Sequence, residues 1–327
     1  MLDVNTSSRA GVAYAALAYG LWGFLPLYIA LTTPTSSVEF IGWRILLSAL
    51  FCAILLAVMR GWRATGRLFR DRRVVGTLAL AGTVVAVNWF VYVFAVMSGH
   101  TVEASLGYFL NPIVSVVLGL VVLKERLRPL QWAAAGVAVV AVLVLAIGYG
   151  SFPWIALVLA CSFGFYGLIK KRVGARAGAI PGFFVETTLI APIGLGCLAW
   201  ALLAGGGITL GSVSTDHTAA LLLAGVVTSL PLLAFAAAAK RLTLVEVGMM
   251  QFIAPITQFL IGVFVFGESM PPERWAGFAI VWVALACFAI DLVIAGRRRS
   301  AATGAPMPRS PADAPGRPGG RGPAGPA

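Results

Sequence analysis

The chain has 327 residues, of which 60% are hydrophobic and only 11% are charged, and its mean hydropathy is +0.93. This balance excludes an ordinary soluble globular domain and predicts a membrane protein. The formal net charge of +12 would suit nucleic acid, but the cations lie between apolar stretches and no separate domain gathers them, so we expect no nucleic-acid partner.

Apolar stretches long enough to cross a bilayer recur up to residue 299. A hydrocarbon core of about 30 Å needs roughly 20 helical residues, and the stretches lack the alternation of a membrane β-strand. The first has no convincing signal-peptide cleavage site, so we expect it to stay in the membrane. We predict an all-α integral membrane protein with ten spanning helices, at residues 10–31, 38–59, 74–97, 102–123, 130–147, 151–169, 181–203, 218–239, 245–266 and 274–294.

The cations are distributed unevenly over this topology. Twenty-two of the 24 Lys and Arg residues fall on one side of the membrane, and only Arg44 and Arg274 do not. This positive-inside bias predicts that both termini are cytoplasmic. The segment 60–73 carries six arginines and one acid. We interpret it as a solvated loop that follows the same rule, and an amphipathic segment lying on anionic lipid is the alternative.

Residues 101–136 and 244–279 are two copies of one segment, 143 positions apart, with eleven identities in 36 positions and no gap. Five predicted helices separate the copies, and an odd number inverts the second copy. The cations Lys124, Arg126 and Arg128 of the first copy are absent from the second, as inversion requires. The identical pairs include Glu103 with Glu246, Phe109 with Phe252, Pro112 with Pro255, Glu125 with Glu268 and Trp132 with Trp275.

The repeat divides the chain into four parts. We predict a cytoplasmic N-terminus at residues 1–9, a first five-helix repeat at 10–147 and a second at 151–294. Residues 300–327 are mostly Pro, Gly, Ala and Arg, which predicts a disordered cytoplasmic tail. A repeat inside a chain this apolar suggests a transporter made of two related halves, with the substrate site where the halves meet.

Arg44 is the strongest candidate for a functional charge. It lies roughly 10 Å into the second span, and no acid occupies the neighbouring i±3 or i±4 positions. A charge in mid-bilayer costs about 2.5–3.5 kcal/mol, so Arg44 needs a partner from another helix, a substrate anion or, by snorkelling, the headgroups. Glu186, in the seventh span, either pairs with Arg44 or binds a proton.

Small-molecule pockets are mainly apolar, with a few polar groups that orient the ligand. Interhelical hydrogen bonding is the alternative role for buried Asn and Gln. The prolines of the two copies, Pro112 and Pro255, predict matching kinks or hinges near the site, or kinks without a role in gating. The complete set assigned to the transport pathway is Arg44, Asn88, Trp89, Tyr108, Asn111, Glu186, Gln251 and Gln258.

Other polar residues have simpler interpretations. Glu39 and Glu246 fit capping boxes at helix starts, and the charge of Glu103 suits a helix N-terminus. His100 and His217 are expected in loops and are too few for a histidine-based metal site. The four cysteines lack paired spacing and are assigned to packing. No nucleotide-binding signature is present, and we expect no metal or cofactor.

Several motifs resemble the RarD branch of the EamA-type drug/metabolite transporters, from about residue 11 to residue 291. They are Ala18-Tyr19-Gly20-Leu21-Trp22-Gly23-Phe24, Asn88-Trp89, Glu103-Ala104-Ser105-Leu106-Gly107-Tyr108-Phe109-Leu110-Asn111-Pro112, Phe165-Tyr166-Gly167-Leu168, Glu186-Thr187 and Gln251-Phe252-Ile253-Ala254-Pro255. The resemblance implies ten helices in two inverted repeats and movement, often outward, of a small metabolite or drug across the inner membrane. The RarD name carries an association with chloramphenicol. Phe252 and Ile256 depart from the Tyr and Thr that the family usually has, which leaves the substrate open.

The leading hypothesis is a secondary transporter, an exporter, that works by alternating access and is driven by the substrate gradient or by protons. An intramembrane enzyme is not expected, because both histidines are placed in loops and the one Asp within a span, Asp291, lies near its end. A lipid flippase or a non-transporting membrane scaffold is the alternative. The expected partners are a small-molecule substrate and the lipid bilayer. The sequence does not determine the oligomeric state, and a dimer is one alternative.

Overall fold

The computed structural model describes residues 4–124, 129–148, 152–173, 177–239, 241–242 and 250–303. Within these ranges the chain folds into helices and contains no strand. Glu246 and the tail beyond residue 303 lie outside the described residues. The elements are α1 (Val4–Gly23), α2 (Leu25–Ala30), α3 (Ser37–Val58), α4 (Trp62–Arg70), α5 (Arg72–Met97), α6 (Thr101–Leu123), α7 (Pro129–Gly148), α8 (Trp154–Val173), α9 (Ala179–Leu189), α10 (Ala191–Leu203), α11 (Thr215–Leu222), α12 (Ala224–Ala239), α14 (Ile253–Leu260), the π-helix η2 (Ile261–Val265) and α15 (Pro272–Thr303).

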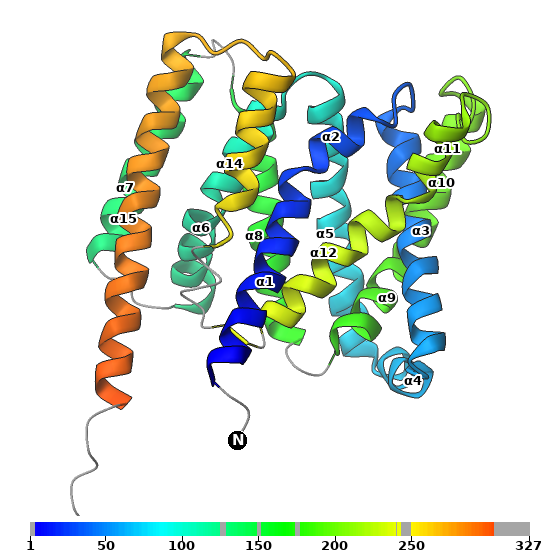
Figure 1. Cartoon of the computed structure of the whole chain (residues 1–327), viewed down its shortest axis with the longest axis horizontal. Coiled ribbons are helices and arrows are strands. Elements are labelled where there is room, and N and C mark those ends of the chain that lie inside the picture. Colours follow the sequence, from blue (N-terminus) through cyan, green and yellow to red (C-terminus); the bar gives the residue numbers. More distant parts are fainter. Residues whose placement is uncertain are drawn as a thin grey trace, which may run out of the picture.

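The long helices stand side by side in one bundle (Figure 1). Four segments of the described chain are long and apolar enough to cross a membrane: Ser37–Val58, Arg72–Met97, Thr215–Ala238 and Pro272–Asp291. A fifth span results if α9 and α10 are counted together. Large apolar side chains cover the outside of the bundle, since Leu203 is 83% exposed and Phe264 72%. Such a surface suits lipid and not water, so the chain is a multi-pass membrane protein.

Several spans that were predicted as single helices are broken. The seventh consists of α9 and α10, which meet at Ile190 with a bend of 45°. The first consists of α1 and α2, which meet at Phe24. Pro192 and Pro26 lie in the first turn of the second helix in each pair, where proline is tolerated because the N–H that it lacks is not needed. The described part of the ninth span is α14 followed by η2.

Helices from the two halves of the sequence pack against each other. The most extensive contacts are those of α7 with α15, α6 with α8, α5 with α8, α1 with α12 and α3 with α10. The largest buried apolar cluster combines Ile41 and Ala104 of the first half with Leu159 and Phe183 of the second. The two halves therefore share one interior.

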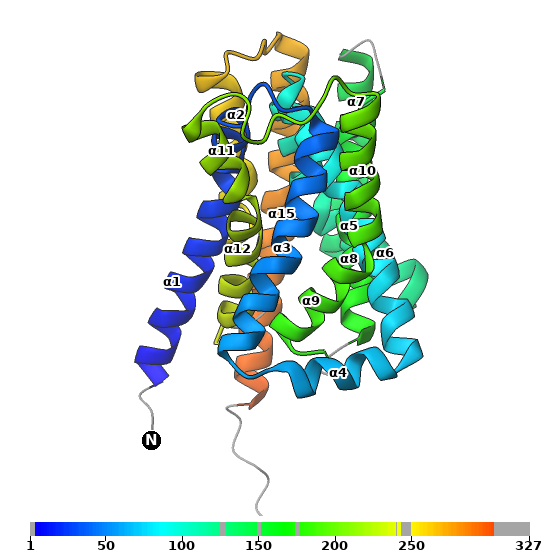
Figure 2. The ribbon, with the colours of Figure 1, turned by 90° about the vertical axis from the view of Figure 1, so that its right-hand side faces the viewer.

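The segment that was interpreted as a solvated loop contains a helix, so that interpretation was wrong. Helix α4 joins α3 to α5 and runs across the lower end of the bundle, crosswise to both (Figure 2). It begins after Arg60, which has a positive φ of 53°, and it ends at Asp71, whose carboxylate caps α5 by accepting from the backbone N–H of Arg73 and Val74.

The turns at Lys124 and Glu268 lie at opposite ends of helix α6. The Glu268 carboxylate accepts hydrogen bonds from the backbone N–H of Thr101 at 2.6 Å and of Val102 at 2.8 Å, at the start of α6. Lys124 directly follows Leu123, the last residue of α6. The 23 residues of α6 rise about 34 Å at 1.5 Å per residue, so the two turns face opposite ends of the bundle.

Candidate functional site

Arg44 lies in the interior of the bundle, on the second turn of helix α3. Its side chain is only 4% exposed, and its Nε and one terminal nitrogen have no hydrogen-bond partner. The guanidinium carbon lies 4.7 Å from the centre of the Trp89 ring on α5. A cation over an indole face is favourable, but it leaves the N–H groups of the guanidinium free to donate.

Three tyrosines, on α2, α5 and α6, interact with this cation. Tyr28, Tyr92 and Tyr108 all interact electrostatically with Arg44. The rings of Tyr92 and Tyr108 pack with their centres 5.5 Å apart, and the buried Tyr92 hydroxyl has no hydrogen-bond partner. The Tyr28 hydroxyl donates to the carbonyl of Ala220 on α11 at 2.7 Å, which ties α2 to the second half of the chain.

Asn88 holds three elements together beside Arg44. Its Nδ2 donates to the Leu159 carbonyl at 3.1 Å and to the Ser162 hydroxyl at 3.0 Å, both on α8. Its Oδ1 accepts from the Tyr108 hydroxyl at 3.0 Å. Asn88, Trp89 and Tyr108 are therefore brought to Arg44, with Asn88 as the group that positions Tyr108.

Glu186 does not pair with Arg44, so that part of the expectation was wrong. Its Oε2 accepts from the Lys170 ammonium group at 2.7 Å, and the Glu186 side chain is fully buried whereas that of Lys170 is 33% exposed. The pair joins α8 to α9, the two helices that flank residues 174–178. From its place in the sequence, Lys170 was treated only as one of the loop cations. The sixth and seventh predicted spans are joined by a short loop, and this already placed Lys170 at the same membrane end as Glu186.

The remaining pathway residues, in the part of the chain that the structure describes, form no hydrogen bond to this cluster. The buried Gln258, on α14, donates from Nε2 to the Trp22 carbonyl at 2.9 Å, and its Oε1 has no partner. Asn111 is half-buried with an unpartnered Oδ1, and Gln251 is half-buried in the turn before α14. Within the described chain, no hydrogen bond joins any of the three to Arg44.

The two prolines have different helical surroundings. Pro112 lies inside α6, where it removes the N–H that would bond the Tyr108 carbonyl. Pro255 lies in the first turn of α14, where a helix needs no such N–H. Their shared role as hinges stays a prediction, because equivalent positions in the repeat do not have the same context.

The carboxylates at the upper end bind other parts of the chain. Ser36 caps α3 as expected, since its hydroxyl accepts from the backbone N–H of Glu39. The Glu39 carboxylate does not complete the capping box. It accepts instead from the backbone N–H and the hydroxyl of Thr209, at 2.8 and 3.0 Å. Glu103 likewise accepts from the N–H of Ile155, at the start of α8. These bonds stabilise contacts between segments distant in sequence.

His217 is not in a loop, as had been expected. It lies buried on α11, where Nε2 contacts the Thr35 hydroxyl at 2.8 Å and the Thr32 carbonyl at 3.1 Å. The residues that sequence reasoning missed near Arg44 are Tyr28, Tyr92 and Ser162. Tyr92 had a local signal, since it lies three residues after Trp89 on the same helix face. The described residues hold no group of three or more metal-ligating side chains.

Comparison with known proteins gives consistent matches. Residues 9–147 match the model of the EamA-like transporter family. A RarD protein of Streptomyces exfoliatus is 43% identical over 94% of this chain and 96% of its own, and a RarD protein of Escherichia coli is 37% identical over 90% and 98%. An uncharacterised transporter of Pseudomonas aeruginosa is 42% identical over 86% and 94%. One solved crystal structure, 19% identical, covers 85% of this chain and 96% of its own with a TM-score of 0.56.

Proposed function

Because this chain belongs to the RarD branch of the EamA-like transporter family, we propose that it exports a small metabolite or drug across the bacterial inner membrane by alternating access. Two inverted five-helix repeats, ten spans in all, would move against each other around a site near Arg44. The alternative, a lipid flippase or scaffold, is not favoured, since relatives similar over most of the chain are named transporters.

Two observations support the inverted arrangement. The sequence repeat pairs Glu125 with Glu268, and the turns at Lys124 and Glu268 lie at opposite ends of α6. The first of these turns carries cations and the second has lost them, so the positive-inside rule assigns the Lys124 end to the cytoplasm. Both chain termini would then be cytoplasmic, because the N-terminus and the last turns of α15 lie at the lower end, where α4 also lies (Figure 2).

The single observation that carries the site is that Arg44 has no carboxylate partner among the residues the structure describes. A buried cation without a counter-charge is costly, and such residues in spans mark substrate or ion pathways. The free N–H donors of the guanidinium fit a carboxylate or another electron-rich acceptor on the substrate. Trp89, Tyr92 and Tyr108 would contact the apolar part of the same molecule. The proposed substrate class is therefore a small, partly apolar compound that carries an acceptor group.

Proton coupling is assigned to the buried carboxylate of Glu186. Glu186 has one oxygen on Lys170, and its carboxylate also interacts with the buried Tyr166, whose ring lies 5.6 Å from the Lys170 ammonium nitrogen. If the Glu186 carboxylate were protonated, its ion pair with Lys170 would break. Proton binding would then be coupled to a change in the contact between α8 and α9. No part of this cycle requires a metal or a nucleotide.

Counterflow in proteoliposomes tests the transport activity. Purified protein is loaded with unlabelled compounds from a panel of small carboxylates, aromatic metabolites and chloramphenicol, and uptake of the matching labelled compound is measured. We expect counterflow of at least one acceptor-bearing compound, with a loss of tenfold or more in Arg44→Met. Absence of counterflow for the whole panel with folded protein, or undiminished counterflow in Arg44→Met, would refute the site.

Accessibility mapping tests the topology separately. Single cysteines replace Lys124 and Ser269, both exposed, after the four native cysteines have been replaced. A membrane-impermeant maleimide applied to intact spheroplasts is expected to label position 269 and not position 124. Equal labelling of both positions would rule out the inverted repeat even if transport is observed.

A further inference from the structure

Helix α4 is held in place by contacts on one of its faces. Thr65 and Leu68 are buried on that face. The ring of Phe184, on α9, lies 5.4 Å from the Trp62 ring and 6.5 Å from the Phe69 ring, measured between centres and edge-on in both cases. The helix is thus a fixed element of the lower end, and its orientation across the bundle (Figure 2) is that of a helix lying in a membrane interface.

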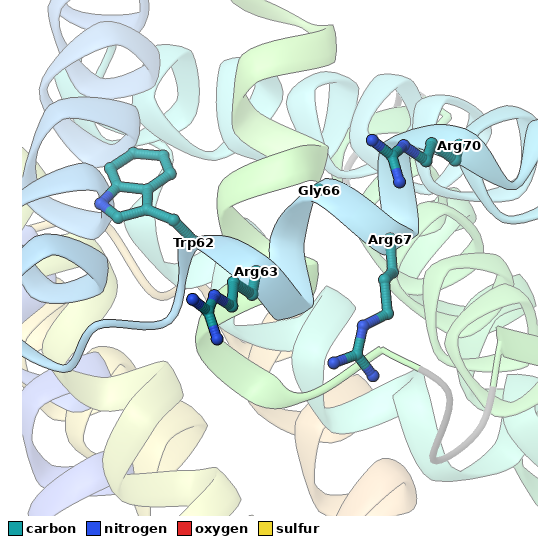
Figure 3. Close-up of a pocket in the computed structure, with 5 residues that line it drawn as sticks. All are labelled: Trp62, Arg63, Gly66, Arg67 and Arg70. Carbon is teal, nitrogen blue, oxygen red and sulfur yellow. The ribbon is translucent and has the colours of Figure 1, made fainter.

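The exposed side of α4 is basic, and Trp62 lies at its border with the docked face. Arg63, Arg67 and Arg70 follow one another at intervals of four and three residues, which places them on the same face of the helix. With Trp62 and Gly66 they line an open surface depression of about 500 Å³, and Arg63 and Arg67 extend to the same side of the helix (Figure 3). A Cβ atom added to Gly66 would meet nothing within 4 Å, so the space between the arginines is open.

These arginines have no counter-charge among the described residues. In the part of the chain that the structure describes, no carboxylate forms an ion pair with Arg63, Arg67 or Arg70. Asp71, the nearest acid in sequence, uses its carboxylate to cap α5. Three unpaired cations around one open space suit an anion with several oxygen acceptors, such as a phosphate group.

Apolar side chains border the same site. Trp62 is 46% exposed, and Val58 and Met59, at the end of α3 just before α4, are 77% and 63% exposed. These exposed apolar side chains would not stabilise a soluble anion. A phospholipid, in contrast, places its acyl chains next to its phosphate, where they can contact such side chains. A tryptophan at the level of the headgroups is also typical of a membrane interface.

We propose that the basic face of α4 binds the headgroup phosphate of an anionic phospholipid, whose acyl chains lie along Trp62 and the end of α3. This site is separate from the proposed pathway around Arg44, and its test needs no transport substrate. Binding would fix the lower ends of α3 and α5 to the membrane surface. A basic residue at an anionic surface contributes about a fivefold gain in affinity, so three of them should select strongly for an anionic lipid.

The test is a titration of the full chain in a neutral detergent with dihexanoyl phosphatidylglycerol, dihexanoyl phosphatidylcholine or sodium phosphate. We expect phosphatidylglycerol to bind at least tenfold more tightly than either of the others. The triple variant Arg63→Gln, Arg67→Gln, Arg70→Gln should reduce its affinity to that of phosphatidylcholine. The control variant Arg9→Gln, Arg72→Gln, Arg73→Gln removes the same charge from exposed positions outside the depression and should keep the preference.

Three results would overturn the proposal. The two phospholipids could bind equally well, both triple variants could lose the same affinity, or sodium phosphate could bind as tightly as phosphatidylglycerol, which would identify a free-anion site. If the triple variant does not fold, Gly66→Glu places a carboxylate in the open space between the arginines. It must weaken phosphatidylglycerol binding at least tenfold, and unchanged binding would also overturn the proposal.

Discussion

The guanidinium of Arg44 and the indole ring of Trp89 form a buried cation–π pair, 4.7 Å from carbon to ring centre. Such a contact contributes about 2 kcal/mol when it is shielded from water, which is less than the several kcal/mol needed to bury an ion. Arg44 is thus retained at a net cost to stability. A residue of this kind is expected where function, and not folding, requires it.

Replacement of Arg44 should therefore separate stability from transport. We expect Arg44→Met to keep or raise the thermal stability in detergent while it lowers counterflow at least tenfold, because methionine fills similar volume without a charge. Arg44→Lys keeps the charge but loses the planar fork and should recover little activity. A loss of thermal stability with normal transport would instead identify Arg44 as structural.

The bond from Tyr108 to Asn88 predicts a measurable coupling. Hydrogen bonds between membrane helices contribute about 0.6 kcal/mol on average and up to about 1.7, so Tyr108→Phe should lose an amount in this range. Asn88→Leu should lose more, because it removes all three hydrogen bonds of Asn88. The double variant should lose less than the sum of the two, measured as unfolding free energies. Tyr14→Phe, at an exposed tyrosine, is the control, and strict additivity would contradict the contact.

The pair of Lys170 and Glu186 predicts an asymmetric response. Lys170→Met leaves the buried carboxylate without its cation and should destabilise the protein by about 2–3 kcal/mol, below the range for fully buried pairs because Lys170 is partly exposed. The double variant Lys170→Met, Glu186→Leu should recover at least half of this loss in thermal unfolding. Arg72→Met removes an exposed cation as a control, and an equal loss there would show that the pair itself matters little.

The packing of α12 against α3 depends on Gly225. A Cβ atom at this position would collide with the carbonyl oxygen of Leu47 on α3. Gly225→Ala should therefore force the two helices apart and cost about 1–3 kcal/mol of stability, as overpacked interiors do. Gly196→Ala, where a Cβ meets nothing within 4 Å, should be neutral or slightly stabilising. Equal thermal stability of the two variants would contradict the close contact.

Much of the fold could be predicted from the sequence. Three features of the chain itself carried the prediction: its apolar runs, the side on which its cations fall, and the repeat of residues 101–136 at 244–279. Each of these signals is the sum of contributions from many residues. The motifs around Asn88 and Tyr108 identified the family for the same reason. Of the candidate site, the consecutive residues Asn88 and Trp89 of α5 were assigned to one pathway with Arg44 and Tyr108, and the structure brings these four into one cluster.

The partners of individual charges were decided only by the tertiary structure. Glu39 binds Thr209 and Glu268 binds the start of α6, in each case across more than 150 positions of sequence. The amphipathic spacing of the arginines in α4 is visible in the sequence, but its docking on Phe184 is not. Local sequence patterns indicate which segments face lipid and which face water. A charge inside the bundle is instead paired with whichever distant group the packing of the helices brings within about 3 Å.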